Sequence, residues 1–361
     1  MPCHKKLFNM KNIYFIPVLL LFIAIFSSCS TKVDLYADYK DVAIVYAMLD
    51  TKADTNFVKI IRAYCGTNDN PIDATEVALI ADSNNYPGKL DARIIELKNS
   101  HGGPYEPTGR VIPLDTITIH DKQEGAFYAP DQKLYYTTEP LLSGSAESNY
   151  KYRLVAVKPN GDSLTALTNT VGNEEFAITS SSIGFQQKPS QDMLCIYFRA
   201  DGMASFYEIQ MQFNYREKIA GQAMKHKHVS RNFGTKMLSE YKFLEESENT
   251  YYQEYGVNWL FNALKTAIGS DTVVNPNHPN VVRYIDDFVI TISAAGDELA
   301  LYYTAHQAQL NSVAPVVIPY TNIVGGFGLF SSRTTISKVV KLSRGTKIDL
   351  FGQTSWGFKE E

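Results

Sequence analysis

The sequence predicts a mainly β protein, built as a tandem β-sandwich whose second domain carries one or two helices. Three observations support this fold class. Short apolar runs recur along the chain, and polar turn clusters such as "DTKADTN" and "KPNGD" separate them. Tyrosine, which β-strands favour, occurs 23 times. The segment "YEIQMQFNYRE" alternates between apolar and polar residues, as an antiparallel strand with one buried face does.

The first predicted domain spans residues 41–174. Its expected strands are "VAIVYAML", "FVKIIRAY", "ARIIELK", "TITIH", "KLYYTTE", "YKYRLVAV" and "SLTALTNTV". Near its end, alternate residues share one face: Tyr150, Tyr152, Leu154 and Ala156. A Pro-Asn-Gly turn and a last strand follow. This pattern resembles the end of an immunoglobulin/fibronectin III-like sandwich, and the loop "LLSGSAESNY" fits the approach to a tyrosine corner.

The second predicted domain, residues 175–361, is β-rich with short helices. In "GVNWLFNALKTAIG" the apolar residues have helical spacing, and Gly269 stands where a helix would end. "GDELALYYTAHQAQL" shows the same spacing. A further short helix is expected in the first domain, where Asp73 is placed to cap it and Glu76 occupies the capping-box position.

The first 28 residues have the parts of a secretory signal peptide. Three lysines precede an apolar run of 14 residues, which is shorter than the roughly 20 that a spanning helix needs. The sequence "FSSC" at its end resembles the bacterial lipobox, in which the cysteine thiol receives a diacylglycerol before cleavage. We therefore predict a lipoprotein signal peptide over 1–28, lipid attachment at Cys29 and a tether over 29–40. Soluble secretion and an uncleaved anchor are the alternatives, and translation starts at Met1 or Met10.

The charge balance and the cysteines restrict the function further. Removal of the signal peptide takes away three of the 34 basic residues and none of the 38 acidic ones, so the mature chain is acidic. This argues against a nucleic-acid-binding protein, which presents basic patches. Beyond Cys29, the cysteines are Cys65 and Cys195, both in apolar strand-like runs. We expect two buried free thiols, with a disulfide between them as the alternative in an oxidising compartment.

The C-terminal stretch "PVVIPYTNIVGGFGLFSSR" is the most distinctive part of the sequence. Together with the lipobox, "VYAMLDTKADTNFVKIIRAY", "KQEGAFYAP" and "DELALYYTAHQ", it resembles an uncharacterised family of Bacteroidota lipoproteins, a domain of unknown function, over most of the mature chain. The resemblance implies anchoring at the outer membrane and frequent genetic neighbourhood with TonB-dependent receptors. It transfers no catalytic residue. The acidic residues that often follow the cysteine in surface-exported lipoproteins are missing after Cys29, so the membrane face stays open.

Three motifs resemble binding sites but have simpler interpretations. "GGFG" lacks the Gly-Lys-Ser/Thr end of a phosphate-binding loop, and we expect a tight turn or bulge. His226 and His228 in "MKHKHVSR" have no third metal ligand nearby in sequence, so a solvated basic loop is expected, with contact to an anionic surface as the alternative. The acidic segments "DTKADTN" and "GTNDNPID" offer oxygen ligands for Ca²⁺ without EF-hand spacing, and we expect turns.

Catalytic motifs are missing from the sequence. It has no Gly-x-Ser-x-Gly elbow and no His-Glu-x-x-His helix. Neighbouring carboxylates would point apart on strands, and a histidine with an adjacent acid would finish a turn; these residues are Asp286 with Asp287, Glu245 with Glu246, and His120 with Asp121. We assign no catalytic residue, metal ligand or cofactor.

The leading prediction is a non-enzymatic, lipid-anchored outer-membrane protein that binds a ligand or partner beside a TonB-dependent receptor. The first alternative is a structural or adhesive surface protein that binds glycans or matrix. The second is a hydrolytic enzyme with no recognisable motif.

Overall fold

The computed structural model describes residues 41–63, 85–120, 131–145, 148–188, 190–245, 247–269, 280–310 and 320–360. The predicted signal peptide with its tether, Cys29, Cys65 and the expected helix at Asp73 lie outside these ranges. Among the described residues, strands predominate and form three sheets around two main hydrophobic cores. The predicted fold class is confirmed: the protein is mainly β, with sheets packed in sandwich-like pairs.

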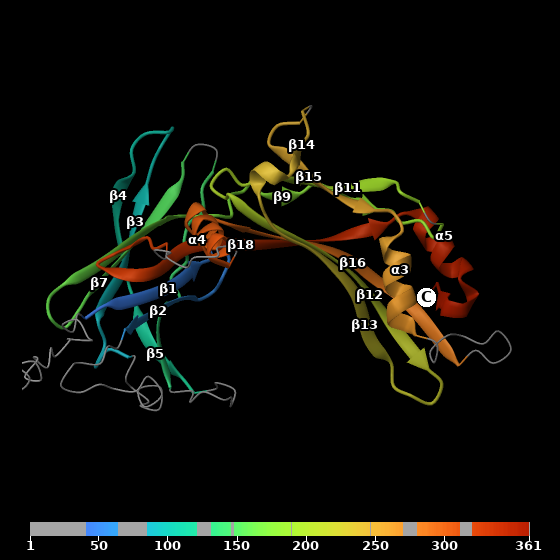
Figure 1. The fold of residues 1–361 in the computed structure, drawn as a ribbon, viewed down its shortest axis with the longest axis horizontal. Coiled ribbons are helices and arrows are strands. Elements are labelled where there is room, and N and C mark those ends of the chain that lie inside the picture. The colour runs from blue at the N-terminus through green and yellow to red at the C-terminus, as the bar shows by residue number, and fades with distance from the viewer. Residues whose placement is uncertain are drawn as a thin grey trace, which may run out of the picture. The chain divides into compact units, whose positions relative to one another are not determined.

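The first core lies between two five-stranded layers (Figure 1). One layer has the order β5, β6, β2, β1 and the first half of β18, and the other has the order β4, β3, β7, β8 and β17. The bounds are β1 (Ala43–Leu49), β2 (Asn56–Arg62), β3 (Asp91–Lys98), β4 (Glu106–Pro113), β5 (Asp115–Ile119), β6 (Gln132–Thr137), β7 (Tyr150–Val157), β8 (Ser163–Asn169), β17 (Ile323–Val324) and β18 (Gly326–Leu342). Buried residues from both layers, such as Val45, Ile60 and Leu154, fill the space between them.

Tyr152 in β7 binds the backbone of the loop that precedes the strand, as the tyrosine of a tyrosine corner does. Its side chain is fully buried, and its hydroxyl accepts a hydrogen bond of 2.7 Å from the backbone N–H of Leu142. The same hydroxyl donates to Glu96 Oε2 at 2.9 Å. Leu142 lies ten residues before Tyr152, so this contact fixes the loop that leads into β7.

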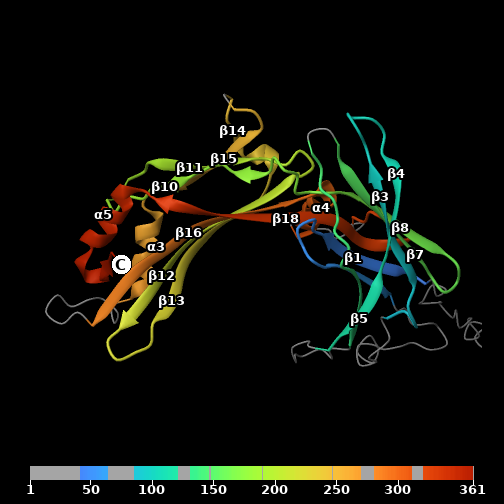
Figure 2. The same cartoon turned by 180° about the vertical axis from the view of Figure 1, so that it is seen from behind.

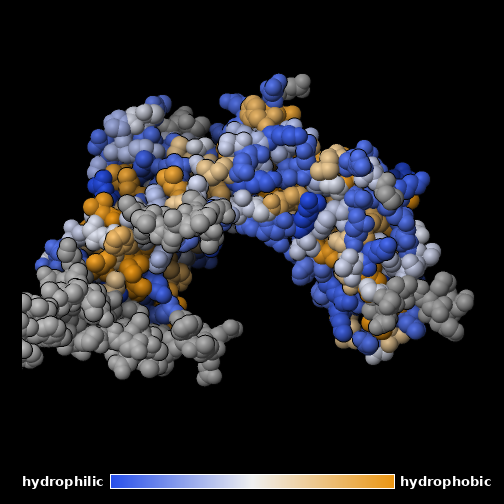
Figure 3. All heavy atoms as spheres, in the orientation of Figure 1, coloured by the Kyte–Doolittle hydropathy of each residue, from blue (hydrophilic) through white to orange (hydrophobic). Residues whose placement is uncertain are grey.

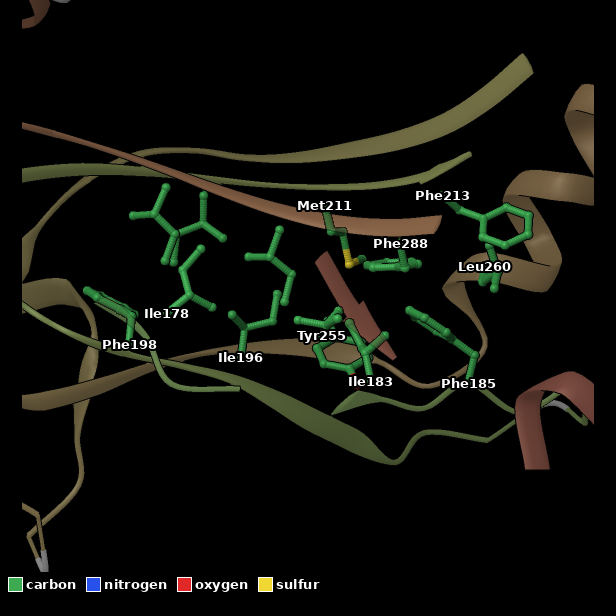
Figure 4. Close-up of a cluster of buried hydrophobic side chains, with 14 of the residues drawn as sticks. Ile178, Ile183, Phe185, Ile196, Phe198, Met211, Phe213, Tyr255, Leu260 and Phe288 are labelled. Carbon is green, nitrogen blue, oxygen red and sulfur yellow. The ribbon is translucent and has the colours of Figure 1, made fainter. Parts of the chain in front are cut away.

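The second core lies between β12, β16 and the second half of β18 on one side and a smaller sheet on the other. The smaller sheet has the order β14, β15, β11, β9, and β13 flanks β12 at the edge of the larger one. The bounds are β9 (Ala177–Ile178), β10 (Ser182–Ile183), β11 (Met193–Arg199), β12 (Phe206–Ile219), β13 (Lys225–Met237), β14 (Lys242–Phe243), β15 (Thr250–Gly256), β16 (Val281–Ala295) and β19 (Phe358–Lys359). In Figure 4, Met211 and Phe288 face Phe185, whose ring centre lies 5.4 Å from that of Phe288.

The alternation in β12 gives this core several of its largest side chains. Residues at every second position are at most 1% exposed: Tyr207, Ile209, Met211, Phe213 and Tyr215. Burial of each large apolar side chain contributes roughly 1.5–3 kcal/mol before entropic costs. The predicted half-buried strand over 207–215 is therefore confirmed.

Both helices predicted in the second half are present. They are α3 (Trp259–Ile268) and α4 (Asp297–Leu310), and a third helix, α5 (Arg344–Gly352), follows β18. The described residues also include two short 3₁₀ turns, η2 (Leu238–Glu240) and η4 (Thr354–Trp356). The helix α3 ends at Gly269, whose φ of +65° favours glycine.

Strand β18 belongs to both cores, and Figure 2 shows it running from β1 to β16. Its first half, through Ser332, pairs in parallel with β1, and its second half, from Arg333, pairs antiparallel with β16. Strands from beyond residue 320 therefore complete the sandwich that begins at residue 41. The predicted domain limits at residues 174 and 175 remain predictions.

The "GGFG" segment is a turn followed by a close strand contact, not a phosphate-binding loop. Gly325 turns the chain from β17 into β18 with a φ of +83°. Gly328 has a φ of +114° and lies against the backbone of Val45 in β1. The predicted use of glycine's conformational freedom is confirmed.

Candidate functional site

The two histidines of "MKHKHVSR" lie in an edge strand, so the expectation of a loop is wrong. His226 and His228 belong to β13 and are exposed. His226 Nδ1 lies 3.8 Å from a carboxylate oxygen of Asp286. Within the ranges that the structure describes, no three His, Cys, Asp or Glu residues are grouped to hold a metal ion.

The neighbouring carboxylates bind different partners, as expected for a strand. Asp286 accepts from the Arg216 guanidinium at 2.5 Å, and Asp287 accepts from the Asn214 amide at 2.6 Å. His120 contacts Asp131 at 2.9 Å on the surface. Of the other adjacent pairs, Asp121 and Glu246 lie outside the described residues, so no geometry is assigned to them.

The acidic turn 50–56 is held by its own side chains. The Asp50 carboxylate accepts from the backbone N–H of Lys52 at 2.9 Å. The Asn56 amide accepts from the Asp50 N–H at 2.7 Å and donates to the Asp50 carbonyl at 3.1 Å. These are turn contacts, as predicted. The segment "GTNDNPID" and Cys65 lie outside the described residues, and Cys195 is a free, half-buried thiol.

The strongest candidate surface is the outer face of the layer β5–β6–β2–β1–β18, hereafter the outer face. Strand register places these side chains together on it: Ile44, Tyr46, Met48, Phe57, Lys59, Ile61, Ile117, Ile119, Leu134, Tyr136 and Phe327. Phe57 lies opposite Tyr136, with ring centres 6.3 Å apart. In Figure 3, hydrophobic residues gather over the region where Figure 1 shows β1 and the start of β18.

This outer face is unusually apolar for a surface. Five of its large hydrophobic side chains are 39–46% exposed: Tyr46, Phe57, Ile117, Ile119 and Phe327. An antiparallel sheet with one face in water normally carries polar residues there. Contiguous exposed apolar surface marks interaction sites in soluble proteins.

A pocket of about 360 Å³ opens at the end of the outer face near the acidic turn. Its walls include the rings of Tyr46 and Phe57 and the side chains of Asn56, Lys59 and Arg333. The Arg333 guanidinium has no hydrogen-bond or ion partner within the described part of the chain. Burial, and to a smaller degree Tyr302, raise the pKa of Tyr46, so its hydroxyl stays neutral. The pocket therefore combines aromatic surfaces with a guanidinium that is open to an anionic or polar group.

A second pocket, of about 310 Å³, contains a carboxylate whose pKa is perturbed. Glu298 in α4 shares its lining with Arg153 and Tyr320. Its Oε2 accepts hydrogen bonds from Thr168 at 2.9 Å and Ser331 at 3.3 Å, and both hydroxyl residues are fully buried. Burial raises the pKa of the Glu298 carboxyl, and the hydrogen bonds to it oppose this shift only in part. The contacts attach the start of α4 to β8 and β18.

The Glu298→Gln variant is expected to lose part of the pH dependence of stability. Because the pKa is higher in the folded than in the unfolded protein, the free energy of unfolding of the wild type falls as pH rises between these two pKa values and stays lower above them. Glutamine keeps an acceptor oxygen for both hydroxyls without the charge, so this decline should vanish. Urea unfolding between about pH 4 and pH 8 measures it.

Glu175→Gln, at an exposed position, is the matched control. The control should follow the wild-type pH profile. If Glu298→Gln also follows the wild-type pH profile, the pKa of the Glu298 carboxyl is not raised by folding and the prediction is wrong.

Sequence reasoning missed the outer face, although a signal was present. Residues 43–49 and 57–61 are apolar at nearly every position instead of alternating. Such runs normally indicate strands that are buried on both faces. In β1 and β2 the second face is open, so the same signal here indicates exposed apolar surface.

Comparisons with known proteins assign no family. No protein-family profile and no curated protein sequence match the chain. Among solved structures, the C-terminal globular domain of an oligosaccharyltransferase from Pyrococcus abyssi matches with 10% identity and a TM-score of 0.22, over 72% of this chain and 49% of that one. A 1.5-MDa bacterial ice-binding adhesin matches with 9% identity and a TM-score of 0.16, over 85% of this chain and 66% of that one. The chain thus spans about half of the first and about two thirds of the second, and neither likeness carries an argument about function.

Within the ranges that the structure covers, no helix has both the length and the apolar character needed to cross a membrane.

Proposed function

We propose that this chain is a lipid-anchored outer-membrane protein that binds a partner protein, a TonB-dependent receptor, through the outer face. The observation that carries the proposal is the group of five exposed hydrophobic side chains on one side of one sheet. Interfaces concentrate binding energy in a few aromatic and aliphatic residues at their centre. Tyr46 and Phe57 have the size, exposure and central strand positions of such residues. The anchor at Cys29 would hold the protein at the membrane where such a receptor is found.

The proposal is tested by co-isolation from detergent-solubilised native membranes, followed by mass spectrometry of the N-terminus and of the eluted proteins. The wild type should carry acyl chains on Cys29 and bring down a TonB-dependent receptor. Tyr46→Ser combined with Phe57→Ser should lower receptor recovery at least about tenfold, since each central aromatic side chain contributes about 2 kcal/mol or more. Val339→Ser, at a residue that is 64% exposed on β18, is the matched control and should retain the receptor.

Two results would contradict the proposal. An unmodified N-terminus, with Cys29→Ala distributed like the wild type, would remove the lipid anchor. Equal receptor recovery by the wild type and the Tyr46/Phe57 variant would remove the outer face from the interface.

A second function, glycan binding by an adhesive surface protein, is favoured by the pocket near the acidic turn. Aromatic faces and polar side chains converge there, on Tyr46, Phe57, Asn56 and Arg333. Binding on a glycan array that Arg333→Ala abolishes, without receptor recovery, would support this function in place of the first.

A further inference from the structure

Most sheet edges in the described residues carry features that prevent pairing with another strand. Strand β4 contains Pro107, Pro113 and Gly109, whose φ is +88°. Strand β13 carries basic side chains and no acidic one, and its register with β12 shifts. Strands β9, β14 and β17 have two residues each. Proline, charge, bulges and shortness are the usual protections of an edge.

Strand β5 lacks these protections. It ends the order of its sheet, and after Asp115 it reads Thr-Ile-Thr-Ile, residues that favour β-structure. Asp115 is paired with Lys89 at 2.5 Å, so the single charge of this strand is partly neutralised. The edge of β5 is therefore chemically suited to accept another strand.

Within the part of the chain that the structure describes, some backbone N–H and C=O groups of β5 have no hydrogen-bond partner. The five residues of β5 pair with β6, and no other backbone hydrogen bond of theirs occurs within the described residues. In an antiparallel pair, only alternate residues direct their N–H and C=O groups to the partner strand. The remaining groups of β5 point away from β6 and form a row of donors and acceptors at the sheet edge.

The side chains of β5 continue the outer face to this edge. Ile117 and Ile119 are 45% and 39% exposed and stand opposite Leu134 and Gln132 of β6. A strand added beyond β5 would place every second side chain beside these isoleucines and cover them. Backbone pairing and apolar burial would then occur together.

We propose that β5 is the docking edge for an extended segment of the partner protein, which adds to the sheet as a further strand. The segment carries aliphatic side chains at alternate positions, toward Ile117 and Ile119, and hydroxyl side chains between them, beside Thr116 and Thr118. Main-chain hydrogen bonds give the affinity in this mode, and the alternate side chains give the specificity. The inference rests on the proposed function and names how the partner binds.

A defined peptide tests the edge. The probe is fluorescein-labelled Lys-Thr-Ile-Thr-Ile-Thr-Val-Lys, titrated with the mature full chain and followed by anisotropy. Saturable binding is expected at a Kd below about 1 mM, with protection of the β5 amides in hydrogen exchange. The same peptide N-methylated at every second residue cannot complete the ladder and should not bind. Absence of saturable binding, or equal binding of the methylated peptide, overturns the inference.

Two adjacent proline substitutions form a matched pair. In Thr116→Pro and Ile117→Pro, one variant removes an N–H that points outward and the other removes an N–H bonded to β6. The outward variant should lower peptide affinity at least about tenfold, since a lost main-chain hydrogen bond and a clash act together, and should keep the wild-type melting temperature. The other should melt earlier. If both variants bind the peptide like the wild type, strand addition is wrong.

Receptor recovery separates this inference from the proposed function. If Tyr46→Ser with Phe57→Ser loses the receptor while both proline variants keep it, the outer face binds through side chains alone and strand addition fails. If all variants keep the receptor, the proposed function fails as well. A concentration-dependent dimer of this chain that the outward proline abolishes would assign the edge to a second copy and overturn the partner assignment.

Discussion

Gly328→Ala is expected to destabilise the protein by about 4 kcal/mol or more, which is at the extreme of single substitutions. A Cβ atom at this position would overlap the Val45 carbonyl oxygen of β1. Real Cβ atoms do not approach a carbonyl so closely, and backbone atoms within a sheet cannot rotate away. The φ of +114° adds a strain of about 1–3 kcal/mol for any other residue.

The consequence reaches both cores, because β18 is common to them. Alanine would force β18 away from β1, and the parallel pairing over residues 43–49 would be lost or shifted. Thermal unfolding followed by circular dichroism should show a melting temperature lower by about 6 °C or more. An unfolding entropy of about 2.1 cal/mol/K per residue makes each kcal/mol worth about 1.5 °C in a chain of this length.

Alanine substitutions at two further glycines separate the effect of steric overlap from that of backbone strain. At Gly352, in α5, an added Cβ meets nothing within 4 Å and φ is ordinary, so alanine should be neutral or slightly stabilising. At Gly109, φ is +88° but the space is open, so alanine should show the strain alone. The loss of stability should increase in the order Gly352→Ala, Gly109→Ala, Gly328→Ala. A Gly328 variant as stable as the Gly109 variant contradicts the prediction.

Local patterns predicted the elements of this fold, but not their long-range pairing. The alternation in β12 and the helical spacing in α3 and α4 depend on neighbours in sequence, and these elements are present as expected. The parallel pair of β1 with β18 joins residues nearly 300 positions apart, and no periodicity encodes that contact. The "GGFG" motif indicated only that glycine was needed, since the carbonyl that it accommodates comes from Val45.

The same limit applies to the candidate surface. Sequence shows that Tyr46 and Phe57 are hydrophobic, but exposure depends on which face the second layer covers. Unbroken apolar runs in β1 and β2 predict two apolar faces and do not tell which one is open. The edge position of β5 likewise follows from the order of the sheet, which the chain defines only after folding.

The second large effect is expected at a buried ion pair, where Glu217→Gln or Arg283→Met should each cost about 3–5 kcal/mol. Arg283 is fully buried, and its guanidinium donates to Glu217 Oε2 at 2.8 and 2.5 Å and to the Trp356 carbonyl at 2.5 Å. The Lys227 ammonium lies 2.6 Å from Glu217 Oε1. Removal of Glu217 takes away the carboxylate that two guanidinium nitrogens of Arg283 bind. Removal of Arg283 takes away the fully buried cation and leaves the Glu217 carboxylate to Lys227, which is partly exposed.

A signal for this pair exists in the alternation of β12. Odd-numbered residues face the core from Tyr207 to Tyr215, and Glu217 continues that series. A carboxylate at an inward position requires a buried cation, and the register of β12 places Arg283 of β16 directly opposite. The sequence indicates the need for a partner, and only the pairing identifies it.

The pair should also make the protein sensitive to acid. Burial by itself would raise the pKa of Glu217, but the hydrogen bonds and charges of Lys227 and Arg283 outweigh it and lower that pKa. Stability from this group is therefore complete above the unfolded-state pKa, near 4.3, and is lost as pH falls toward the folded-state value. Glu298, with its pKa shifted upward, contributes in the opposite direction.

A double-mutant cycle distinguishes two cases. Either the ion pair itself stabilises the fold, or only the removal of one partner without the other is costly. The variants are Glu217→Gln, Arg283→Met and their combination, measured by urea unfolding at neutral pH. Because each single variant removes one half of a buried charge pair and the double variant removes both halves, the double variant should recover part of the loss. Asp115→Asn, which breaks an exposed pair with Lys89, should cost less than about 1 kcal/mol. Additive losses in the cycle would mean that the two side chains act independently, which their contacts at 2.5 and 2.8 Å do not allow.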